Sequence, residues 1–327
     1  MTVLVTGSSG HLGEALVRSL RTANRPVRGL DLNPSPFTDF VGSICDRDFV
    51  GRCMAEATSV IHAATLHKPH LVTHTSKDFV DANITGTLVL LEAAVSKRIS
   101  AFVFTSTTSA FGSALRPGAS EAATWITEDV ASVPKNLYGV TKIAAENLCE
   151  LFARKQALPV VILRTSRFFP EPDDDPAVRE RYQAANVQAN EMLYRRVDLE
   201  DAVSAHLLAV ECASRFRFRR YIVSATTPFS RDDLPDLRAN AAHVVRRKFP
   251  NAEPLFLARG WALVPKIDRV YINALARREL GWEPKYDFQH VLHCLRTGDD
   301  FRSPLAKTVG IKGYHGRFFS DGIYPVA

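Results

Sequence analysis

The stretch Val3-Leu4-Val5-Thr6-Gly7-Ser8-Ser9-Gly10-His11-Leu12-Gly13 decides the fold class. A short apolar run is followed at once by three glycines, and an apolar pattern with helical period begins within the glycine segment. Glycine permits a tight turn at position 7, close approach of a pyrophosphate at position 10, and close packing of the helix on the strand at position 13. The first turn of such a helix offers unpaired N–H groups to phosphates. The stretch therefore predicts a dinucleotide-binding β–α unit.

Short apolar runs alternate with helical patterns across the first 225 residues, which predicts an α/β protein with a Rossmann-type, doubly wound parallel sheet. We expect further strands at 27–32, 59–63, 102–105, 160–163 and 221–224, and helices at 12–20, 79–97, 138–155 and 198–213. Residues 1–165 are expected to form the dinucleotide-binding domain, with a return to the sheet at about 196–225. Residues 166–195 and 226–327 are expected to form a smaller substrate-binding region.

The second expected strand ends at Asp31. A carboxylate at this position can accept hydrogen bonds from both hydroxyls of an adenosine ribose, and it would repel a 2′-phosphate. The next residues, Leu32-Asn33-Pro34, supply no arginine to neutralise such a phosphate, so NAD is favoured over NADP. The alternative is that Asp31 only forms the turn before Pro34.

Composition and charge exclude several other classes of protein. The net charge of +6 can attract an anionic substrate, but no basic stripe with interleaved aromatic residues indicates nucleic acid. No run approaches the roughly 20 apolar residues that span a bilayer, so we expect no membrane partner. The five cysteines are odd in number and form no C-x-x-C pair, which indicates reduced thiols and a cytoplasmic protein.

A possible catalytic group lies in Tyr138-Gly-Val-Thr-Lys142, where a phenol and an ammonium group lie one helical turn apart on one face. A phenol with a pKa near 10 is a poor base at neutral pH, and a neighbouring cation favours the phenolate. Upstream, the hydroxyl-rich segment 105–112 ends a strand at the carboxyl edge, where such sheets bind ligands. A hydroxyl there can orient a reacting alcohol or carbonyl group.

Together these segments resemble an extended short-chain dehydrogenase/reductase of the NAD-dependent epimerase/dehydratase family. The matching segments are T-G-S-S-G-H-L-G at 6–13, Asp31, V-I-H-A-A at 60–64, N-I-T-G-T at 83–87, T-S-T-T-S-A-F-G at 105–112, Y-G-V-T-K at 138–142, R-V-D-L-E-D-A at 196–202 and R-R-E-L-G-W-E-P at 277–284. The resemblance implies that Tyr138 is the acid/base, that Lys142 binds the nicotinamide ribose, and that Thr107 is the catalytic hydroxyl, with Ser106 beside it.

The resemblance also implies a set of contacts to NAD. The expected cofactor residues are Gly7, Ser9, Gly10, His11, Leu12, Gly13, Asp31, Ser43, Ile44, Ala63, Ala64, Asn83, Tyr138 and Lys142. Among them, Asn83 would support the active-site helix, and the two alanines would lie beneath the cofactor. The family often has Asp before the isoleucine that contacts adenine, whereas this chain has Ser43-Ile44 with Asp46 following.

Two further departures concern the reaction and the substrate. Sugar-nucleotide dehydratases usually carry Asp-Glu after the catalytic threonine, but this chain has Thr108-Ser109, whose hydroxyls cannot supply the acid and base that eliminate water. Nucleotide-sugar epimerases tend to have Asn where this chain has Arg167. The segment around it, 164–172, resembles the loop of uronate dehydrogenases that meets a substrate carboxylate. Arg167 can bind a carboxylate or phosphate in two-point fashion, or it can pair with the acidic run 173–175.

A histidine-rich loop follows the third expected strand of the core. His67, Lys68 and His70 are candidate substrate contacts, as is Thr108, and the alternative for the loop is a solvent-exposed surface. The histidines show no tetrahedral spacing with cysteine, and hydride transfer needs no metal, so we expect no metal site.

The sequence thus predicts an NAD-dependent oxidoreductase that acts on a secondary alcohol of a sugar, a sugar acid or a nucleotide sugar. The alternatives are a nucleotide-sugar epimerase that holds NAD tightly and a non-catalytic NAD-sensing binding protein, against which the intact Tyr138–Lys142 pair speaks. Relatives often dimerise through the helices at roughly 79–97 and 138–155, so a homodimer is expected.

Overall fold

The computed structural model describes residues 1–118 and 120–313. Its main feature is a seven-stranded parallel sheet in the order β3-β2-β1-β4-β5-β7-β8. The strands are Val3–Thr6 (β1), Val27–Asp31 (β2), Phe40–Val41 (β3), Ser59–His62 (β4), Ala101–Thr107 (β5), Val160–Thr165 (β7) and Phe218–Val223 (β8). The chain reverses its direction of winding between β1 and β4, and ligands bind at the carboxyl edge of such a switch point. The predicted fold class is confirmed.

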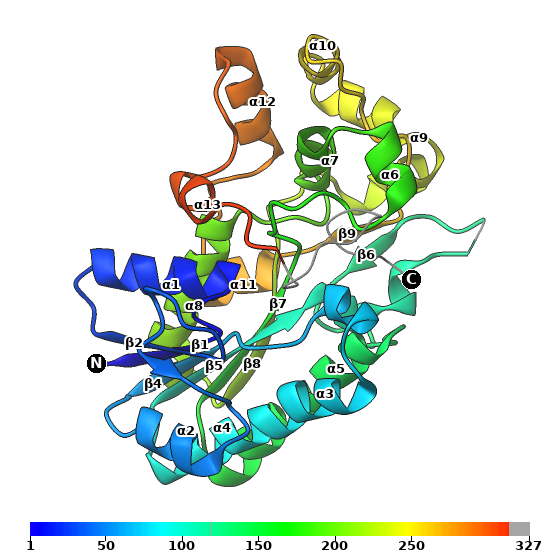
Figure 1. Cartoon of the computed structure of the whole chain (residues 1–327). Coiled ribbons are helices and arrows are strands. Elements are labelled where there is room, and N and C mark those ends of the chain that lie inside the picture. The colour runs from blue at the N-terminus through cyan, green and yellow to red at the C-terminus, as the bar shows by residue number, and fades with distance from the viewer. Residues whose placement is uncertain (119, 314–327) are drawn as a thin grey trace.

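Helices cover both faces of the sheet (Figure 1). One face carries His11–Thr22 (α1), Leu199–Cys212 (α8) and Ala274–Leu280 (α11); the other carries Arg47–Cys53 (α2), Ser76–Val80 (α3), Gly86–Ser96 (α4) and Leu137–Gln156 (α5). Each face has its own apolar core, one built on Leu16 and Leu163 and the other on Leu90 and Ile162. Burial on both faces explains why the central strands are almost wholly apolar.

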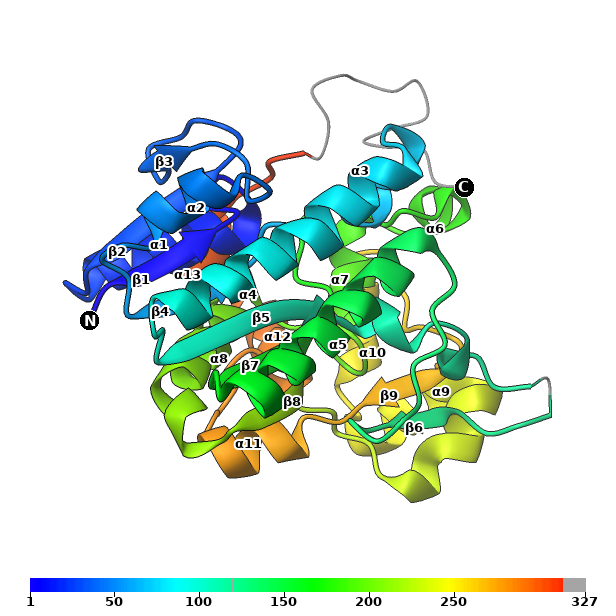
Figure 2. The same ribbon diagram turned by 90° about the horizontal axis from the view of Figure 1, so that it is seen from below.

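The helical stretch Ser76–Ser96 is long and apolar enough to cross a membrane by length and composition alone, which corrects the expectation that no segment approaches this limit. In the fold it forms α3, a π-helical turn at Asp81–Thr85, and α4. It runs beside α5 beneath the sheet (Figure 2), with Phe79, Leu90 and Leu91 fully buried. The apolar composition therefore provides the core contacts of this face.

A second group of elements lies above the carboxyl edge of the sheet (Figure 1). It comprises Pro176–Arg181 (α6), Ala184–Glu191 (α7), Leu234–Lys248 (α9), Ala252–Leu257 (α10), Phe288–Thr297 (α12), Pro304–Val309 (α13) and a two-stranded parallel sheet of Thr124–Ile126 (β6) and Arg269–Tyr271 (β9). Its core centres on Phe256, Trp261 and Phe288. Strand β6 comes from within the expected domain 1–165, and the part of 226–327 from residue 314 lies outside the described residues. The predicted division remains a prediction.

One boundary differs from the expected one in a way that matters for the site. Strand β5 continues to Thr107 rather than ending at 105, because Ser106 and Thr107 pair in register with Arg164 and Thr165 of β7. This extension fixes Ser106 and Thr107 in the strand, and a 3₁₀ helix at Thr108–Phe111 follows directly. All five cysteines are free thiols, as their odd number predicted.

Candidate active site

A cavity of about 1000 Å³ lies at the carboxyl edge of the sheet, between the sheet and the upper elements. All but two of the predicted site residues line it: Gly7, Ser9, Gly10, His11, Leu12, Gly13, Asp31, Ser43, Ile44, Ala63, Ala64, His67, Lys68, His70, Ser106, Thr107, Thr108, Tyr138 and Arg167. The two exceptions are Asn83 and Lys142, which are buried behind its wall. The fold therefore brings the predicted cofactor, catalytic and substrate residues to one place.

The glycine turn has the backbone that a phosphate site requires. Gly7 has a φ of +75°, a conformation that favours glycine. A Cβ on Gly13 would lie 1.9 Å from the carbonyl oxygen of Gly7, so only glycine allows helix α1 to approach the turn this closely. Gly10 precedes the first residue of α1 and lines the cavity, so that the N-terminus of the helix faces the space for a pyrophosphate. The residues fit a dinucleotide.

The carboxylate of Asp31 is oriented by the same turn. Its Oδ2 accepts a hydrogen bond from the backbone N–H of Ser9 at 3.0 Å, and its Oδ1 accepts one from Asn33 at 2.9 Å. Ser43 and Ile44 line the cavity near the ends of the neighbouring strands. An anchored carboxylate with remaining lone pairs suits the two hydroxyls of a ribose and opposes a 2′-phosphate.

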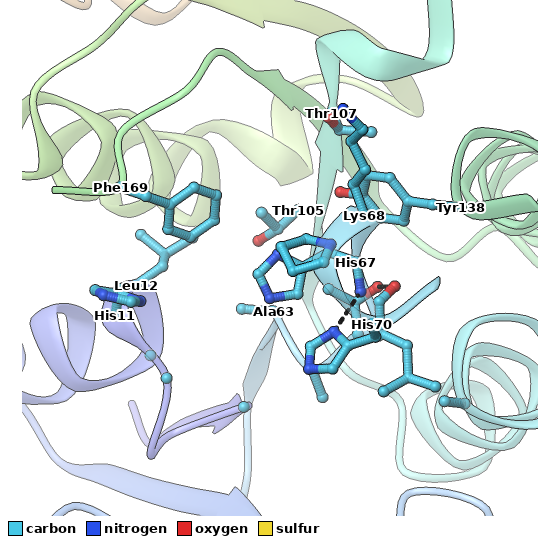
Figure 3. Close-up of a pocket in the computed structure, with 18 of the residues that line it drawn as sticks. His11, Leu12, Ala63, His67, Lys68, His70, Thr105, Thr107, Tyr138 and Phe169 are labelled. Atoms are coloured by element: carbon cyan, nitrogen blue, oxygen red, sulfur yellow. Dashed lines mark hydrogen bonds between the residues drawn. The ribbon is translucent and has the colours of Figure 1, made fainter. Parts of the chain in front are cut away.

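Tyr138 and Thr107 form the polar centre of the cavity. Tyr138 lies in the first turn of α5, which begins where the side chain of Asn136 accepts a hydrogen bond from Gly139. Burial raises the pKa of the Tyr138 hydroxyl to about 12, and a hydrogen bond with Thr107 acts in the opposite direction. In Figure 3 these two side chains lie on one side of the pocket, and His11 and Phe169 lie across from them. The open space between the two walls is where a ring and a substrate can meet this hydroxyl pair.

Lys142 lies one turn further along α5 and is 3% exposed. Its Nζ donates a hydrogen bond to the carbonyl oxygen of Thr105 at 2.7 Å and lies 4.0 Å from the centre of the Phe104 ring. Burial lowers the pKa of the ammonium group to about 7. The cation is thus held at the inner wall, beneath the strand that carries Thr107.

Ser106 differs from Thr107 because successive side chains of a strand point to opposite faces. Its Oγ donates a hydrogen bond to Glu146 Oε1 at 2.6 Å, and Glu146 also accepts two hydrogen bonds from Arg164, at 3.0 and 2.7 Å. The Ser106 hydroxyl is therefore committed to a buried ionic group, and the hydroxyl that meets Tyr138 is that of Thr107. Sequence reasoning missed Glu146, although it lies one helical turn after Lys142.

The side-chain amide of Asn83 makes only protein contacts in the described chain. It donates to the carbonyl oxygen of Leu66 at 2.8 Å and to Thr141 at 2.9 Å, and it accepts from Leu66 N–H at 2.8 Å and from Thr65 at 2.9 Å. Asn83 thus ties the loop after β4 to α5. This is the supporting position that the resemblance implied, and its amide does not reach the cavity.

The predicted substrate cations are paired within the protein. Arg167 lies 3.0 Å from a carboxylate oxygen of Asp173 and 3.5 Å from one of Asp174, and Lys68 forms an ion pair with Asp174. Although burial raises the pKa of Asp174, the hydrogen bond and charge of Lys68 and the charge of Arg167 lower it to about 2. Arg167 therefore pairs with the acidic run 173–175, which was the alternative to a ligand-binding role.

The histidine-rich loop forms an aromatic wall beside Tyr138. The ring of His67 lies 6.4 Å from that of Tyr138 and 5.4 Å from that of Phe169, and His70 Nδ1 accepts a hydrogen bond from His67 N–H at 3.0 Å. In the part of the chain that the structure describes, no cluster of three or more histidine, cysteine or acidic residues could hold a metal ion. Phe169 gave no recognisable signal in the sequence.

The C-terminal part of the described chain also reaches the cofactor end of the cavity. His11 Nε2 lies 2.8 Å from Glu171 Oε1, and the same carboxylate accepts the backbone N–H groups of Lys312 and Gly313, each at 3.3 Å. The ammonium group of Lys312 pairs with Glu14 in the first turn of α1. The segment that ends at Gly313 is thereby fastened beside the phosphate turn.

Comparison with known proteins gives three findings. A model of the NAD dependent epimerase/dehydratase family matches residues 3–221. A dTDP-glucose 4,6-dehydratase of Streptomyces niveus is 33% identical over 192 residues, which are 52% of this chain and 55% of that protein. The chain spans about half the length of the curated relatives it matches.

Two solved structures share the fold. One is a short-chain dehydrogenase/reductase superfamily protein from Agrobacterium tumefaciens with bound NAD, with a TM-score of 0.66, 23% identity, and coverage of 94% of this chain and 99% of that one. The other is the UDP-glucose 4-epimerase of Thermotoga maritima with UDP-glucose, with a TM-score of 0.60, 23% identity, and coverage of 91% and 99%. The family match includes the glycine turn, Asp31, Thr107, Tyr138 and Lys142, and NAD is the cofactor of this family. The chain belongs to the NAD dependent epimerase/dehydratase family.

Proposed function

We propose that the protein oxidises a secondary alcohol of a nucleotide sugar or of a related sugar acid, with NAD as the hydride acceptor. The observation that carries this proposal is that Tyr138 and Thr107 line the same side of the cavity (Figure 3), with the Lys142 ammonium group held behind the strand on the carbonyl oxygen of Thr105. NAD, when bound between the glycine turn and this pair, supplies the position to which hydride is transferred. The remaining chemistry is that of the protein's own side chains.

Thr107 Oγ1 holds the substrate hydroxyl and aligns its oxygen with the phenol. Tyr138 Oη takes the hydroxyl proton, and the carbonyl group forms as the hydride leaves the same carbon that carried the hydroxyl. The buried phenol has a pKa of about 12 before ligands bind, so proton transfer needs positive charge nearby. Lys142 supplies such a charge when protonated. The His67 and Phe169 rings keep water away from the reacting groups.

Dehydration is disfavoured in spite of the relatives that carry that name. The residues after Thr107 are Thr108 and Ser109, and both line the cavity. Neutral hydroxyls are weak acids and weak bases, so neither can remove a proton from carbon or protonate a leaving hydroxyl efficiently. A carboxylate pair at this place would be required.

An epimerase is the second candidate, and the fastening of the C-terminal segment favours it. An epimerase returns the hydride to its own substrate and therefore retains the cofactor between turnovers. The contacts of Lys312 with Glu14 and Glu171 beside the phosphate turn would slow the release of NAD. A dehydrogenase must break or bypass these contacts in every cycle.

Purified protein with NAD and a panel of nucleotide sugars and sugar acids tests the proposal. Continuous formation of NADH, followed by its absorbance, supports the dehydrogenase. Inversion of a sugar stereocentre without net NADH, followed by NMR of the product, supports the epimerase. If no member of the panel is turned over while NAD binds, the non-catalytic NAD-binding alternative takes precedence.

We also propose that a second copy of the chain covers the outer face of α3, α4 and α5. Val80 at the end of α3 is 40% exposed, and Val140 and Leu151 on α5 are 48% and 41% exposed; α3 and α4 run beside α5 in Figure 2. Exposed apolar side chains gathered on one helical face favour association. Light scattering of the purified protein should give twice the mass of 36.2 kDa, and a mass of one chain would refute the dimer. A cytoplasmic location remains a prediction.

A further inference from the structure

The substrate side of the cavity carries four cationic side chains, and three of them are neutralised. Lys68 and Arg167 pair with Asp174 and Asp173, as described above. Arg195 Nη2 lies 2.7 Å from Glu191 Oε1. The fourth cation, Arg269, is on β9 and also lines the cavity.

Arg269 is unpaired within the part of the chain that the structure describes. Within residues 1–118 and 120–313, no hydrogen bond or ion pair reaches its guanidinium group, and its Nε is fully buried. Arg269 as a whole is partly exposed, but its Nε is buried, and a buried donor without an acceptor loses its hydrogen bond to water without replacement. An Nε donor without a partner, on an arginine that lines the cavity, is available to a ligand bound there.

The strand presents a second unused polar group on the same face. Tyr271 is two residues after Arg269, so both side chains point to one side of β9, and Val270 between them points into the apolar core. Tyr271 lines the cavity, is 3% exposed, and stacks on Phe111 with ring centres 6.3 Å apart. No described residue hydrogen-bonds its hydroxyl. A rigid donor therefore lies beside the guanidinium.

The surroundings of this strand are positive. Lys135 lies near both Arg116 and Arg269, and in the described chain neither Lys135 nor Arg116 has a carboxylate partner. Partial burial lowers the pKa of Lys135, and the positive charges of Arg116 and Arg269 lower it further. An anion bound here would relieve this repulsion. The net charge of +6 on the whole chain also favours an anionic ligand.

We propose that Arg269 and Tyr271 form the subsite that binds an oxyanion of the substrate. The proposal rests on the proposed function and deepens it, since it identifies the substrate as an anionic carbohydrate. A guanidinium fork and a phenol match both a phosphate of a nucleotide sugar and the carboxylate of a sugar acid. Arg269 would determine specificity without contacting the reacting carbon. It takes the role that the sequence suggested for Arg167.

The test is a binding titration that does not depend on turnover. Isothermal titration calorimetry of the NAD-loaded protein is carried out with UDP and with glucuronate, and with uridine and glucose as their neutral counterparts. We expect UDP or glucuronate to bind more tightly than its neutral counterpart. Tight UDP binding assigns the subsite to phosphate, and tight glucuronate binding assigns it to a carboxylate. Binding of neither anion would overturn the proposal.

Three variants locate the binding energy. Arg269→Gln should weaken binding of the anion about 10- to 100-fold and leave the neutral counterpart unchanged, because a hydrogen bond to a charged group is lost. Arg269→Lys keeps the positive charge but loses the two-pronged guanidinium group, so its affinity for the anion should lie between those of Arg269→Gln and the wild type. The matched control is Arg277→Gln, which removes one positive charge from the exposed surface of α11 and should bind like the wild type. Equal anion binding by the Arg269→Gln and wild-type proteins would refute the assignment.

Two further variants distinguish a failure of the anion subsite from a folding defect and from a failure of the proposed reaction. Tyr271→Phe changes a single hydroxyl, so it reports on the subsite even if the Arg269→Gln protein does not fold, and it should weaken anion binding severalfold. Tyr138→Phe should bind the anion normally while turnover is lost. If no substrate is turned over and anion binding still requires Arg269, the subsite stands and the proposed reaction fails.

Discussion

Replacement of Glu146 by glutamine should destabilise the protein far more than the same change one turn later on the same helix. Glu146 is 1% exposed and holds Arg164, which is 3% exposed, through hydrogen bonds of 3.0 and 2.7 Å. It also accepts the hydroxyl of Ser106 at 2.6 Å and lies 2.9 Å from Arg220 Nε. The variant Glu146→Gln leaves the buried Arg164 cation without a counter-charge and turns an NH₂ group toward its donors.

Removing one partner of a buried ion pair costs about 3–5 kcal/mol, because the remaining charge stays buried. Two cations share Glu146, so we expect the loss in the free energy of unfolding to lie in the upper part of this range. The control is Glu150→Gln: Glu150 also faces Arg220, at 3.6 Å, but its side chain is 36% exposed. Exposed pairs contribute at most about 1 kcal/mol.

The assay is equilibrium unfolding in urea, followed by tryptophan fluorescence, with Trp282 buried in the core beside α8 as one reporter. Turnover should also fall for Glu146→Gln, since Ser106 precedes the catalytic Thr107 in β5. Equal losses of stability in Glu146→Gln and Glu150→Gln would show that the buried group does not hold the strand and the helix together.

Three other predictions follow from the contacts of the site. Gly13→Ala should weaken NAD binding more than tenfold in a fluorescence titration, because its Cβ would lie 1.9 Å from the Gly7 carbonyl oxygen; Gly51→Ala, which meets nothing within 4 Å, should bind NAD normally, and equal binding by both variants would contradict the packing argument. Tyr138→Phe should lower turnover by about two to four orders of magnitude with little change in NAD affinity, and unchanged turnover would remove Tyr138 from the mechanism. Burial lowers the pKa of Lys142 from 10.5 to about 7, so between these values the unfolded chain binds more protons and stability should rise with pH. Lys142→Met should flatten that rise in urea unfolding measured across this pH window, and an unchanged slope would refute the shift.

The parts of the site that follow from local chain geometry were predictable from the sequence. The glycine turn, Asp31, and the hydroxyl segment all lie at strand ends, and parallel strands bring their ends to one edge. Tyr138 and Lys142 lie one helical turn apart, so their shared face follows from the helix alone. These residues could be predicted because neighbours in sequence determine where they point.

Contacts between distant segments could not be predicted in the same way. The role of Glu146 depends on Ser106, Arg164 and Arg220 converging on one helix, and no local pattern encodes that convergence. Arg167 could have bound a ligand or the acidic run, and the choice depends on a loop folding back on itself. Arg269 stands in a short strand whose partner, β6, precedes it by more than a hundred residues.

The central claim is that NAD bound at the glycine turn presents its nicotinamide ring to the hydroxyls of Tyr138 and Thr107. A crystal structure of the protein soaked with NAD tests it most directly. The account predicts electron density for the ring between Phe169 and the Tyr138–Thr107 pair, with the adenosine ribose on the carboxylate of Asp31. Density that puts the ring outside this space, with Tyr138 facing only protein, would contradict it.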